Sequence, residues 1–436
     1  MAHPAVIGVR GPAERVRTAP ALAGRAIVVG AGIGGAAQSL LLARSGMDVT
    51  LLEQMAEPAD AGAAIFLQAN GLAVLYGLGL EEALGARGAR ITRGTIYGER
   101  GVPLLETRLP QFGEGLDHGL VVTRRHLLEL LHDALREEPR LTLRPGVRVN
   151  AVLPDGDGVR FTEESGAGRE LRGALVVGAD GVHSRVRPHV DPEARVRDPG
   201  IRYVRGIAPG AFLADAAEWW TPLGLFGALP LGREGEGGVY FFTSVSDRRI
   251  GDAVRERDLR AFRNAWCDAI PSARRILSRV TSFDALILTD VLSVDCHQLS
   301  RGRVALIGDA AHAMAPNAGQ GANSALVDAA VLLQELGSAP NVFSALAAYD
   351  RRRRRPVRMA QEVSDRLAEL AHVSRPWLRR LRDRALPVIA RAAGRQRLLR
   401  RLMQEEPALL RSVSAARGQP RSSPRAAAVD EPNGYQ

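Results

Sequence analysis

The chain contains no lysine and only two cysteines, Cys267 and Cys296. Two cysteines cannot build a disulfide framework, and their positions have no metal-ligand spacing, so the sequence predicts a reduced compartment, a cytoplasmic location and no metal site. All 58 strongly basic residues are therefore arginine, and the formal net charge is +10. Such a bias is more typical of a GC-rich genome than of selection for phosphate contacts. Because a nucleic-acid recognition motif and interleaved aromatic residues are also missing, nucleic acid is not expected as a partner.

A long apolar run is missing as well. A membrane-spanning helix needs about 20 predominantly apolar residues, and even the richest segment, 322–336, includes Asn323, Asp328 and Glu335. The first 23 residues contain arginines and prolines but no apolar core of a secretory signal. We therefore expect neither a transmembrane segment nor secretion.

The composition is that of an ordinary globular protein, with 46% hydrophobic and 24% charged residues in a chain of 436. This length predicts roughly two to three domains. Residues 1–23 and 412–436 lack periodicity and are expected to be a flexible extension and a disordered tail. The surplus of positive charge lies in the segment Arg351–Arg411. Its run Arg351–Arg355 is interpreted as a solvated helix face, with an anionic membrane surface or a partner protein as lesser alternatives.

Hydrophobic periodicity indicates an α/β domain that is discontinuous in sequence, over 24–195 and 295–340. It opens with a strand at 25–29, a helix to about residue 45 and a strand at 49–53, which together form a βαβ unit. Further strands are expected at 119–123, 148–152, 159–162, 170–178 and 304–308, and helices at 125–136 and 322–336.

The segment 196–294 has a different pattern and is interpreted as an inserted domain with a mixed or antiparallel sheet. Its strands are expected at 201–207, 224–229 and 239–245, with one helix at 257–269. Beyond it, residues 341–411 are helical in pattern, and Pro356, Pro376 and Pro387 are expected to break this region into pieces.

The first βαβ unit carries a glycine motif. Gly30, Gly32 and Gly35 form a G-x-G-x-x-G turn between strand and helix, which combines a tight turn, close backbone approach to a pyrophosphate and close helix packing. Glu53 ends the next strand, where its carboxylate can accept hydrogen bonds from ribose hydroxyls. This register predicts a dinucleotide site, with the neighbouring residues Ile33, Gly34 and Gln54 also in contact with the ligand.

Two further motifs make a resemblance specific. The segment VVGADGVHSRVR contains Asp180 and Gly181, and the segment RVALIGDAAHAMAPNAGQGANSALVDA contains Gly308 and Asp309. Together with the glycine turn, they resemble class A flavoprotein monooxygenases, the family of the para-hydroxybenzoate and salicylate hydroxylases. The resemblance spans about residues 25–400. It implies a Rossmann-like FAD-binding domain over 24–195 and 295–340 and a substrate domain over 196–294.

The resemblance also implies roles for individual residues. Asp180 would contact both flavin and nicotinamide, Asp309 the ribityl chain, and Arg124 the FAD phosphates and ribose. A helix beginning near Gly321 and Ala322 would direct its amides at the flavin ring, whose reduced form is anionic, so the positive end of the helix dipole would favour reduction. We assign no chemistry to His312, for which a packing or backbone-bonded role is expected, and no catalytic acid or base is identified.

Substrate-contacting residues are expected in the inserted domain and beside the flavin. The candidates are Phe66, Pro316, Trp220 and Phe226. The aromatic residues at 219, 220, 226 and 240–242 could line a cavity, but alternate residues of a strand must fill the core. About half of them are therefore structural, and the pattern does not say which half. Phe66 is equally compatible with an ordinary core position.

By resemblance, NADH or NADPH would reduce bound FAD, O2 would add at the flavin C4a position, and the distal oxygen of that hydroperoxide would pass to a small, aromatic or polycyclic substrate, by hydroxylation or epoxidation. Two alternatives stay open. One is an FAD-dependent reductase or dehydrogenase of the same superfamily, and the other is a noncatalytic flavoprotein that acts through its basic C-terminal helices. The sequence does not indicate an oligomeric state.

Overall fold

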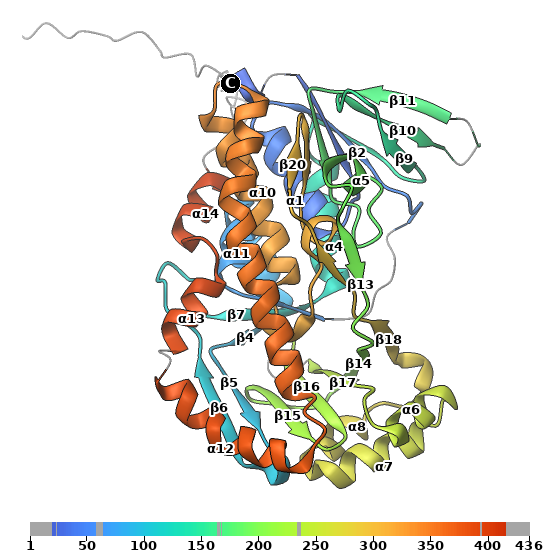
Figure 1. The fold of residues 1–436 in the computed structure, drawn as a ribbon, viewed down its shortest axis with the longest axis vertical. Coiled ribbons are helices and arrows are strands. Elements are labelled where there is room, and N and C mark those ends of the chain that lie inside the picture. Colours follow the sequence, from blue (N-terminus) through green and yellow to red (C-terminus); the bar gives the residue numbers. More distant parts are fainter. Residues whose placement is uncertain are drawn as a thin grey trace, which may run out of the picture.

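The computed structural model describes residues 20–22, 24–57, 64–163, 166, 168–232, 237–392 and 395–415. Most of the expected flexible ends, 1–23 and 412–436, lies outside these residues. Within the first segment, Pro20–Leu22 forms a turn of 3-10 helix. Within the second, residues 412–415 are the last residues of helix α14 (Pro407–Ala415). Figure 1 shows an α/β part with the small β9–β11 sheet beside it, a second β-sheet flanked by short helices, and long C-terminal helices along one side.

The α/β part is built on a six-stranded sheet. Its strands in spatial order are β20 (Ser300–Arg301), β21 (Val304–Leu306), β12 (Leu175–Gly178), β1 (Arg25–Val29), β2 (Asp48–Leu52) and β8 (Leu141–Arg144). All neighbouring pairs are parallel except β20–β21. The expected βαβ unit is confirmed, with helix α1 (Ile33–Arg44) between β1 and β2.

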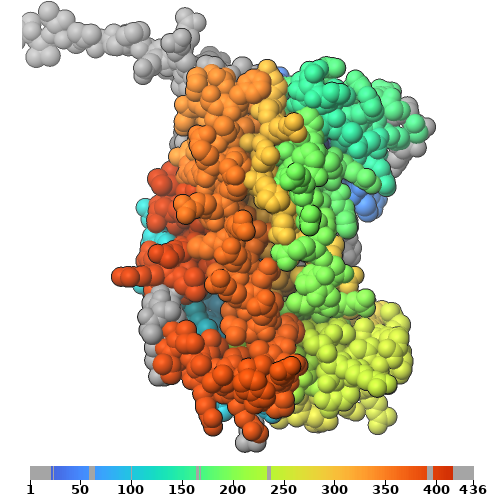
Figure 2. All heavy atoms as spheres, in the orientation of Figure 1, coloured from blue at the N-terminus to red at the C-terminus, as the bar shows by residue number. Residues whose placement is uncertain are grey.

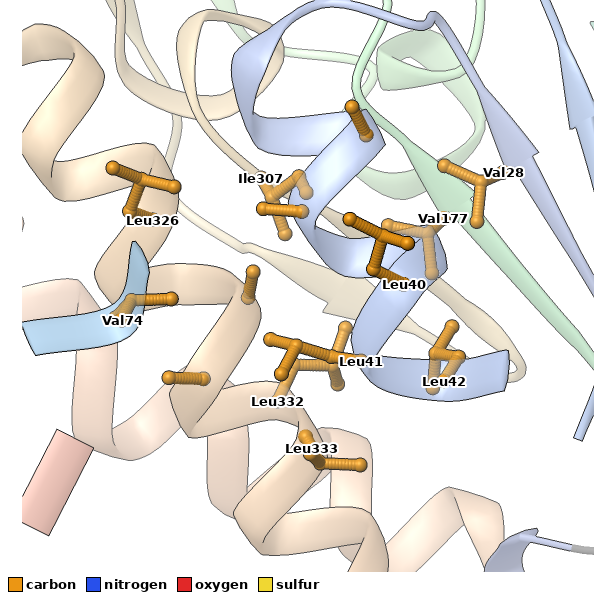
Figure 3. Close-up of a cluster of buried hydrophobic side chains, with 14 of the residues drawn as sticks. Val28, Leu40, Leu41, Leu42, Val74, Val177, Ile307, Leu326, Leu332 and Leu333 are labelled. Carbon is orange, nitrogen blue, oxygen red and sulfur yellow. The ribbon is translucent and has the colours of Figure 1, made fainter. Parts of the chain in front are cut away.

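Helices α1 and α10 (Gly321–Ser338) carry hydrophobic residues around most of their circumference. They can therefore be buried on several sides. Figure 3 shows Leu41 of α1 beside Leu332 of α10, and Leu40 of α1 on the side of Val177 of the sheet, within one buried cluster. This packing holds the N-terminal ends of both helices next to the sheet.

Shorter elements surround this sheet. They are the antiparallel set β3 (Ala64–Leu67), β7 (Gly119–Thr123) and β4 (Ala89–Ile91), the antiparallel set β9 (Arg148–Val152), β10 (Gly158–Thr162) and β11 (Gly168–Arg172), the pair β13 (Arg195–Arg197) and β19 (Ser293–Asp295), and the helices α2 (Ala69–Gly77), α3 (Glu81–Arg87), α4 (Arg124–Arg136), α5 (Arg187–Val190) and α9 (Asp309–His312). The expectation of a single strand at 170–178 is therefore wrong. It is two strands, because β11 pairs with β10 whereas β12 pairs with β1.

The second sheet has seven strands. In spatial order they are β18 (Ile287–Asp290), β14 (Arg202–Pro209), β17 (Gly238–Ser244), β16 (Gly224–Leu231), β15 (Ala216–Thr221), β5 (Arg93–Tyr97) and β6 (Pro103–Arg108). The segment 196–294 supplies β14 to β18, whereas β5 and β6 come from residues 93–108, which the sequence division had placed in the first domain. They join the sheet through the parallel pairing of β5 with β15. Helices α6 (Arg248–Arg255), α7 (Leu259–Ala269) and α8 (Arg274–Leu277) pack on one face of this sheet.

The C-terminal region consists of α11 (Val342–Ala371), α12 (Pro376–Ala392), α13 (Arg395–Leu402) and α14. These helices cover one side of the molecule along most of its length in Figure 2. Pro376 begins α12, where a missing N–H costs nothing. Pro356 and Pro387, however, lie inside helices, so the expectation that they break the region is wrong. No described helix is long and apolar enough to cross a membrane.

Candidate active site

A cavity of about 880 Å³ lies between the carboxyl ends of the parallel strands and one face of the seven-stranded sheet. This edge of a parallel sheet is where α/β proteins place their ligands. Most of the residues predicted from the sequence line the cavity: Gly30, Gly32, Ile33, Gly34, Glu53, Gln54, Phe66, Arg124, Asp180, Asp309, Pro316, Gly321 and Ala322.

The glycine turn has the geometry that its spacing predicts. Gly30 has φ +98°, and a Cβ on it would lie 2.5 Å from the carbonyl oxygen of Ala179. A Cβ on Gly35 would lie 1.9 Å from the Gly30 carbonyl oxygen, so Gly35 serves the packing of α1 against β1 and does not line the cavity. Among the described residues, no atom lies within 4 Å of the corresponding position on Gly32, which faces open space.

The N-terminus of α1 is free to meet an anion. The first turn contains no acidic residue, and no side chain in the described part of the chain caps it. The first amides of a helix have no partner within the helix, and the helix dipole adds positive potential there. Beside them, Glu53 is held by two backbone amides: its Oε2 accepts the Ala31 N–H at 2.7 Å and its Oε1 the Met55 N–H at 2.9 Å.

The loop after β12 holds Asp180 at the cavity. Its Oδ2 accepts the Arg185 N–H at 2.6 Å, whereas its Oδ1 is buried with no partner among the described residues. Burial raises the pKa of Asp180, although the hydrogen bonds in this loop act in the opposite direction. Arg187, from the same motif, donates to the carbonyl oxygen of Ala310 at 3.0 Å, so the second and third motifs are joined directly.

The loop after β21 presents Asp309 to the cavity, and Asp328 on α10 holds this loop. The carboxylate of Asp328 accepts the Gly308 N–H at 2.9 Å and contacts Nε2 of His312 at 2.6 Å. His312 thus has a structural partner, as expected of a packed residue, but the partner is a carboxylate and not the backbone. Burial alone would raise the pKa of Asp328, but the charges of His312 and Arg353 hold it at about 2.

Arg353 corrects the interpretation of the arginine run. It is fully buried, with its Nε 2.7 Å from the Asp328 carboxylate, so the run is not entirely a solvated face. The helical period turns residue 353 towards α10, whereas Arg351 and Arg354 point to solvent.

Asn323 fixes the flavin-proximal segment, a role that sequence reasoning missed. Its side chain donates to the carbonyl oxygens of Phe66 at 3.0 Å and Gly319 at 2.7 Å, and its oxygen accepts the Gln68 N–H at 3.0 Å. These bonds tie β3 to the start of α10. Asn323 is fully buried, and its position in a mostly apolar segment was the available signal.

The seven-stranded sheet contributes an aromatic and polar wall: Tyr203, Arg205, Glu218, Tyr240 and Phe242 all line the cavity. Two candidate substrate residues, Phe226 and Trp220, do not line the cavity. Phe226 is fully buried on the opposite face, stacked 6.0 Å from Phe241, because strand alternation directs it towards α7. Trp220 shares the cavity-side face but packs in a separate core, under the guanidinium of Arg382 at 5.1 Å.

The residues present fit FAD. The open glycine cradle and the free α1 amides suit a pyrophosphate, Glu53 suits ribose hydroxyls, and the unpartnered Oδ1 of Asp180 can accept a further hydrogen bond. A parallel sheet with this turn, facing an aromatic wall, defines a dinucleotide-binding oxidoreductase.

The chain belongs to the family described as FAD binding domain, which matches residues 24–364. Within it, the chain is a class A FAD-dependent aromatic monooxygenase. It is 32% identical to the aurachin C monooxygenase/isomerase of Stigmatella aurantiaca, over 74% of this chain and 83% of that protein. It is also 32% identical to the 2-heptyl-3-hydroxy-4(1H)-quinolone synthase of Pseudomonas aeruginosa, over 86% of this chain and 97% of that protein.

Solved structures agree with this membership. The tetrameric form of 2-methyl-3-hydroxypyridine-5-carboxylic acid oxygenase has 27% identity and a TM-score of 0.68, and the match covers 81% of this chain and 92% of that one. Klebsiella pneumoniae HpxO, complexed with FAD and uric acid, has 24% identity and a TM-score of 0.72, over 87% of this chain and 97% of that one, and supports the fold.

Proposed function

We propose that this monooxygenase uses NADH or NADPH and O2 to hydroxylate or epoxidise a small aromatic or heteroaromatic substrate. The observation that carries the proposal is a single cavity in which the three cofactor motifs face an aromatic wall. A flat substrate can stack on Phe242 and the cavity-side tyrosines, while the opposite wall holds the cofactor.

The residues of the α/β part would hold FAD. Ile33 and Gly34 offer their amides to the pyrophosphate, and Glu53 its carboxylate to a ribose. Arg124 would add positive charge near the phosphates, and Asp309 would contact the ribityl chain. Gln54 borders the same end of the cavity as Glu53.

The start of α10 would control the ring end of the cofactor. Gly321 and Ala322 line the cavity at the helix N-terminus, and no side chain caps this end. Amides there stabilise negative charge, which a flavin carries at its N1 and C2 carbonyl edge when reduced. The flavin, when bound, supplies electron transfer from nicotinamide and the transfer of one oxygen atom. The protein would orient the substrate and exclude water from the reacting atoms.

The relatives support a heteroaromatic substrate. One is named for a quinolone and another, a solved structure, for a hydroxypyridine carboxylic acid. The wall of this chain combines aromatic rings with one cation and one carboxyl group, which suits a ring that carries polar atoms.

The proposal is tested by following NAD(P)H oxidation, oxygen uptake and hydrogen peroxide together, with the purified FAD-loaded protein and a panel of phenols, aromatic acids and polycyclic aromatics. We expect ligand-stimulated oxidation with little peroxide and a product heavier by one oxygen. Substrate reduction or oxidation without oxygen incorporation would instead identify a reductase or dehydrogenase. Absence of any nicotinamide oxidation would favour a noncatalytic flavoprotein.

A further inference from the structure

One row of residues crosses the cavity wall. The strand register pairs Arg205 with Phe242, Phe242 with Gly227 and Gly227 with Glu218. Directly opposed residues point to the same face of a sheet. Three strand spacings separate the first and last members, so their backbones lie about 14 Å apart. A cation and a carboxyl group therefore stand at opposite ends of one row.

The ring of Phe242 occupies the space between them. A Cβ on Gly227 would lie 2.1 Å from Cζ of Phe242, so glycine at this position lets the ring lie over the neighbouring strand. The row is therefore an aromatic floor between two polar ends. A flat ligand that lies on this floor meets Arg205 at one end and Glu218 at the other.

Glu218 is held with one oxygen free. Its Oε1 accepts the indole N–H of Trp220, and no other hydrogen bond to its carboxyl group is found within the described residues. Trp220 is itself only 1% exposed, and Arg382 covers its ring. The carboxyl group thus has a fixed orientation, and its second oxygen remains available to a ligand.

Arg205 is also available. It lines the cavity and forms no ion pair with a carboxylate in the described part of the chain. Its guanidinium can donate to a carbonyl or an oxyanion. Buried polar groups are costly when they lack partners, so a ligand that satisfies both ends is favoured over one that leaves an end unpaired.

We propose that Glu218 and Arg205 select a flat heteroaromatic substrate that carries a hydrogen-bond donor at one end of its ring system and a carbonyl or oxyanion at the other. This assignment rests on the proposed monooxygenase function and specifies its substrate class. Glu218 accepts the N–H or O–H of the ring, and Arg205 donates to the opposite oxygen. The Glu218 contact raises the electron density of the ring, which favours attack by an electrophilic oxygen, whereas the Arg205 contact fixes the orientation of the ring.

The test compares ligands that differ only in the donor. The probes are 4-pyridone, 4-quinolone and acridone, each with its N-methyl counterpart, and binding to the FAD-loaded protein is measured by the change in flavin absorbance. We expect the wild type to bind at least one N–H probe about tenfold or more tightly than its N-methyl counterpart. Glu218→Gln should remove this preference. The indole N–H of Trp220 would still donate to the amide oxygen of the new side chain, so its N–H2 group would be directed at the N–H of the ligand, and two donors cannot form a hydrogen bond with each other.

Asp215, which directly precedes β15, provides a matched control. Asp215→Asn removes a carboxylate that pairs with Arg93 outside the cavity, and it should leave the preference unchanged. Glu218→Leu gives a second variant without any acceptor, and it should favour the N-methyl probes.

A pH series provides a separate readout. Burial raises the pKa of Glu218 to about 7, and the Trp220 hydrogen bond acts against this rise. Tyr203 and Arg205 of β14 line the same cavity as Glu218, and Arg382 lies behind Trp220. Because only the ionised carboxylate is purely an acceptor, N–H probes should bind more tightly as pH rises through about 7, and Glu218→Gln should abolish this dependence.

Equal binding of N–H and N-methyl probes by the wild type, failure of every N–H probe to bind, or an unchanged preference in Glu218→Gln would overturn the proposal. Each of these results can occur while another substrate is still oxygenated in the product assay. The substrate assignment would then fail without the monooxygenase function, whereas loss of that function would show as an absence of oxygenated product with every ligand.

Discussion

The guanidinium of Arg353 lies 2.7 Å from the carboxylate of Asp328, and both side chains are completely buried. Arg353 belongs to α11 and Asp328 to α10. Because Asp328 also accepts the Gly308 N–H at 2.9 Å, this ion pair connects the C-terminal region with the loop that presents Asp309. The third cofactor motif is therefore supported from outside the α/β part.

Replacing Arg353 should destabilise the fold strongly. Removing one partner of a buried ion pair leaves an uncompensated charge, which costs about 3–5 kcal/mol. Arg353→Met should lower the free energy of urea unfolding by this amount and reduce the FAD content. The neighbouring Arg354→Met breaks a half-exposed pair with Asp350 and should cost at most about 1 kcal/mol. Equal losses in both variants would contradict the role given to the buried pair.

The same pair should give stability that is lost in acid. The pKa of Asp328 is held at about 2 in the folded chain, below its value of about 3.9 in an unfolded chain. A lowered pKa contributes stability above the unfolded value, which disappears as pH falls towards the folded value. The difference in unfolding free energy between wild type and Asp328→Asn should therefore be largest above about pH 5 and shrink between about pH 4 and pH 2. Asp133→Asn, on the exposed side of α4, should show no such trend. A difference that stays constant down to pH 2 would be inconsistent with this assignment.

Gly32→Ala should separate cofactor binding from folding. A Cβ at this position meets no atom of the described residues within 4 Å, and the backbone conformation, φ −68° and ψ −176°, is open to alanine. The added methyl group points into the space assigned to the pyrophosphate, so FAD should bind about tenfold or more weakly while the cofactor-free protein unfolds at the same urea concentration. Gly85→Ala, which also meets no neighbour, should leave FAD affinity unchanged. An unaltered dissociation constant for Gly32→Ala would place the phosphates elsewhere.

Asp309→Ala should lose much of its FAD. A hydrogen bond to a charged group contributes about 1.5–3 kcal/mol, so the dissociation constant should rise about tenfold to a hundredfold. The flavin content of the purified variant and titration of the cofactor-free protein measure this loss directly. Asp133→Ala serves as the surface control. Wild-type flavin content in Asp309→Ala would remove this residue from the cofactor site.

Local motifs could be interpreted from the sequence because their spacing encodes their geometry. Gly30, Gly32 and Glu53 lie within one βαβ unit, where neighbours in sequence are neighbours in space. Asp180 and Asp309 lie two and three residues beyond the ends of two strands of the same parallel sheet, so their common edge follows from the topology.

The second sheet was less predictable, because its faces depend on pairing with distant segments. Alternation shows that Phe226 and Phe242 occupy definite faces, but only the register with β14 and β15 decides which face meets the cavity. The addition of β5 and β6 from residues 93–108 depends on one parallel pairing that no local pattern announces. Arg353 was misplaced for a similar reason, since its buried partner lies on another helix.

Helix α11 spans the distance between the two walls of the cavity. Its Arg353, in the first half of the helix, is anchored beside the loop of Asp309, and Ala368 and Ala371 at its C-terminal end pack in the core that contains Trp220. Thirty residues of helix extend for about 45 Å, and Figure 1 shows this helix running along most of the molecule. The stretch from Arg353 to Ala371 extends for about 27 Å, so one continuous helix connects the loop of Asp309 with the core around Trp220.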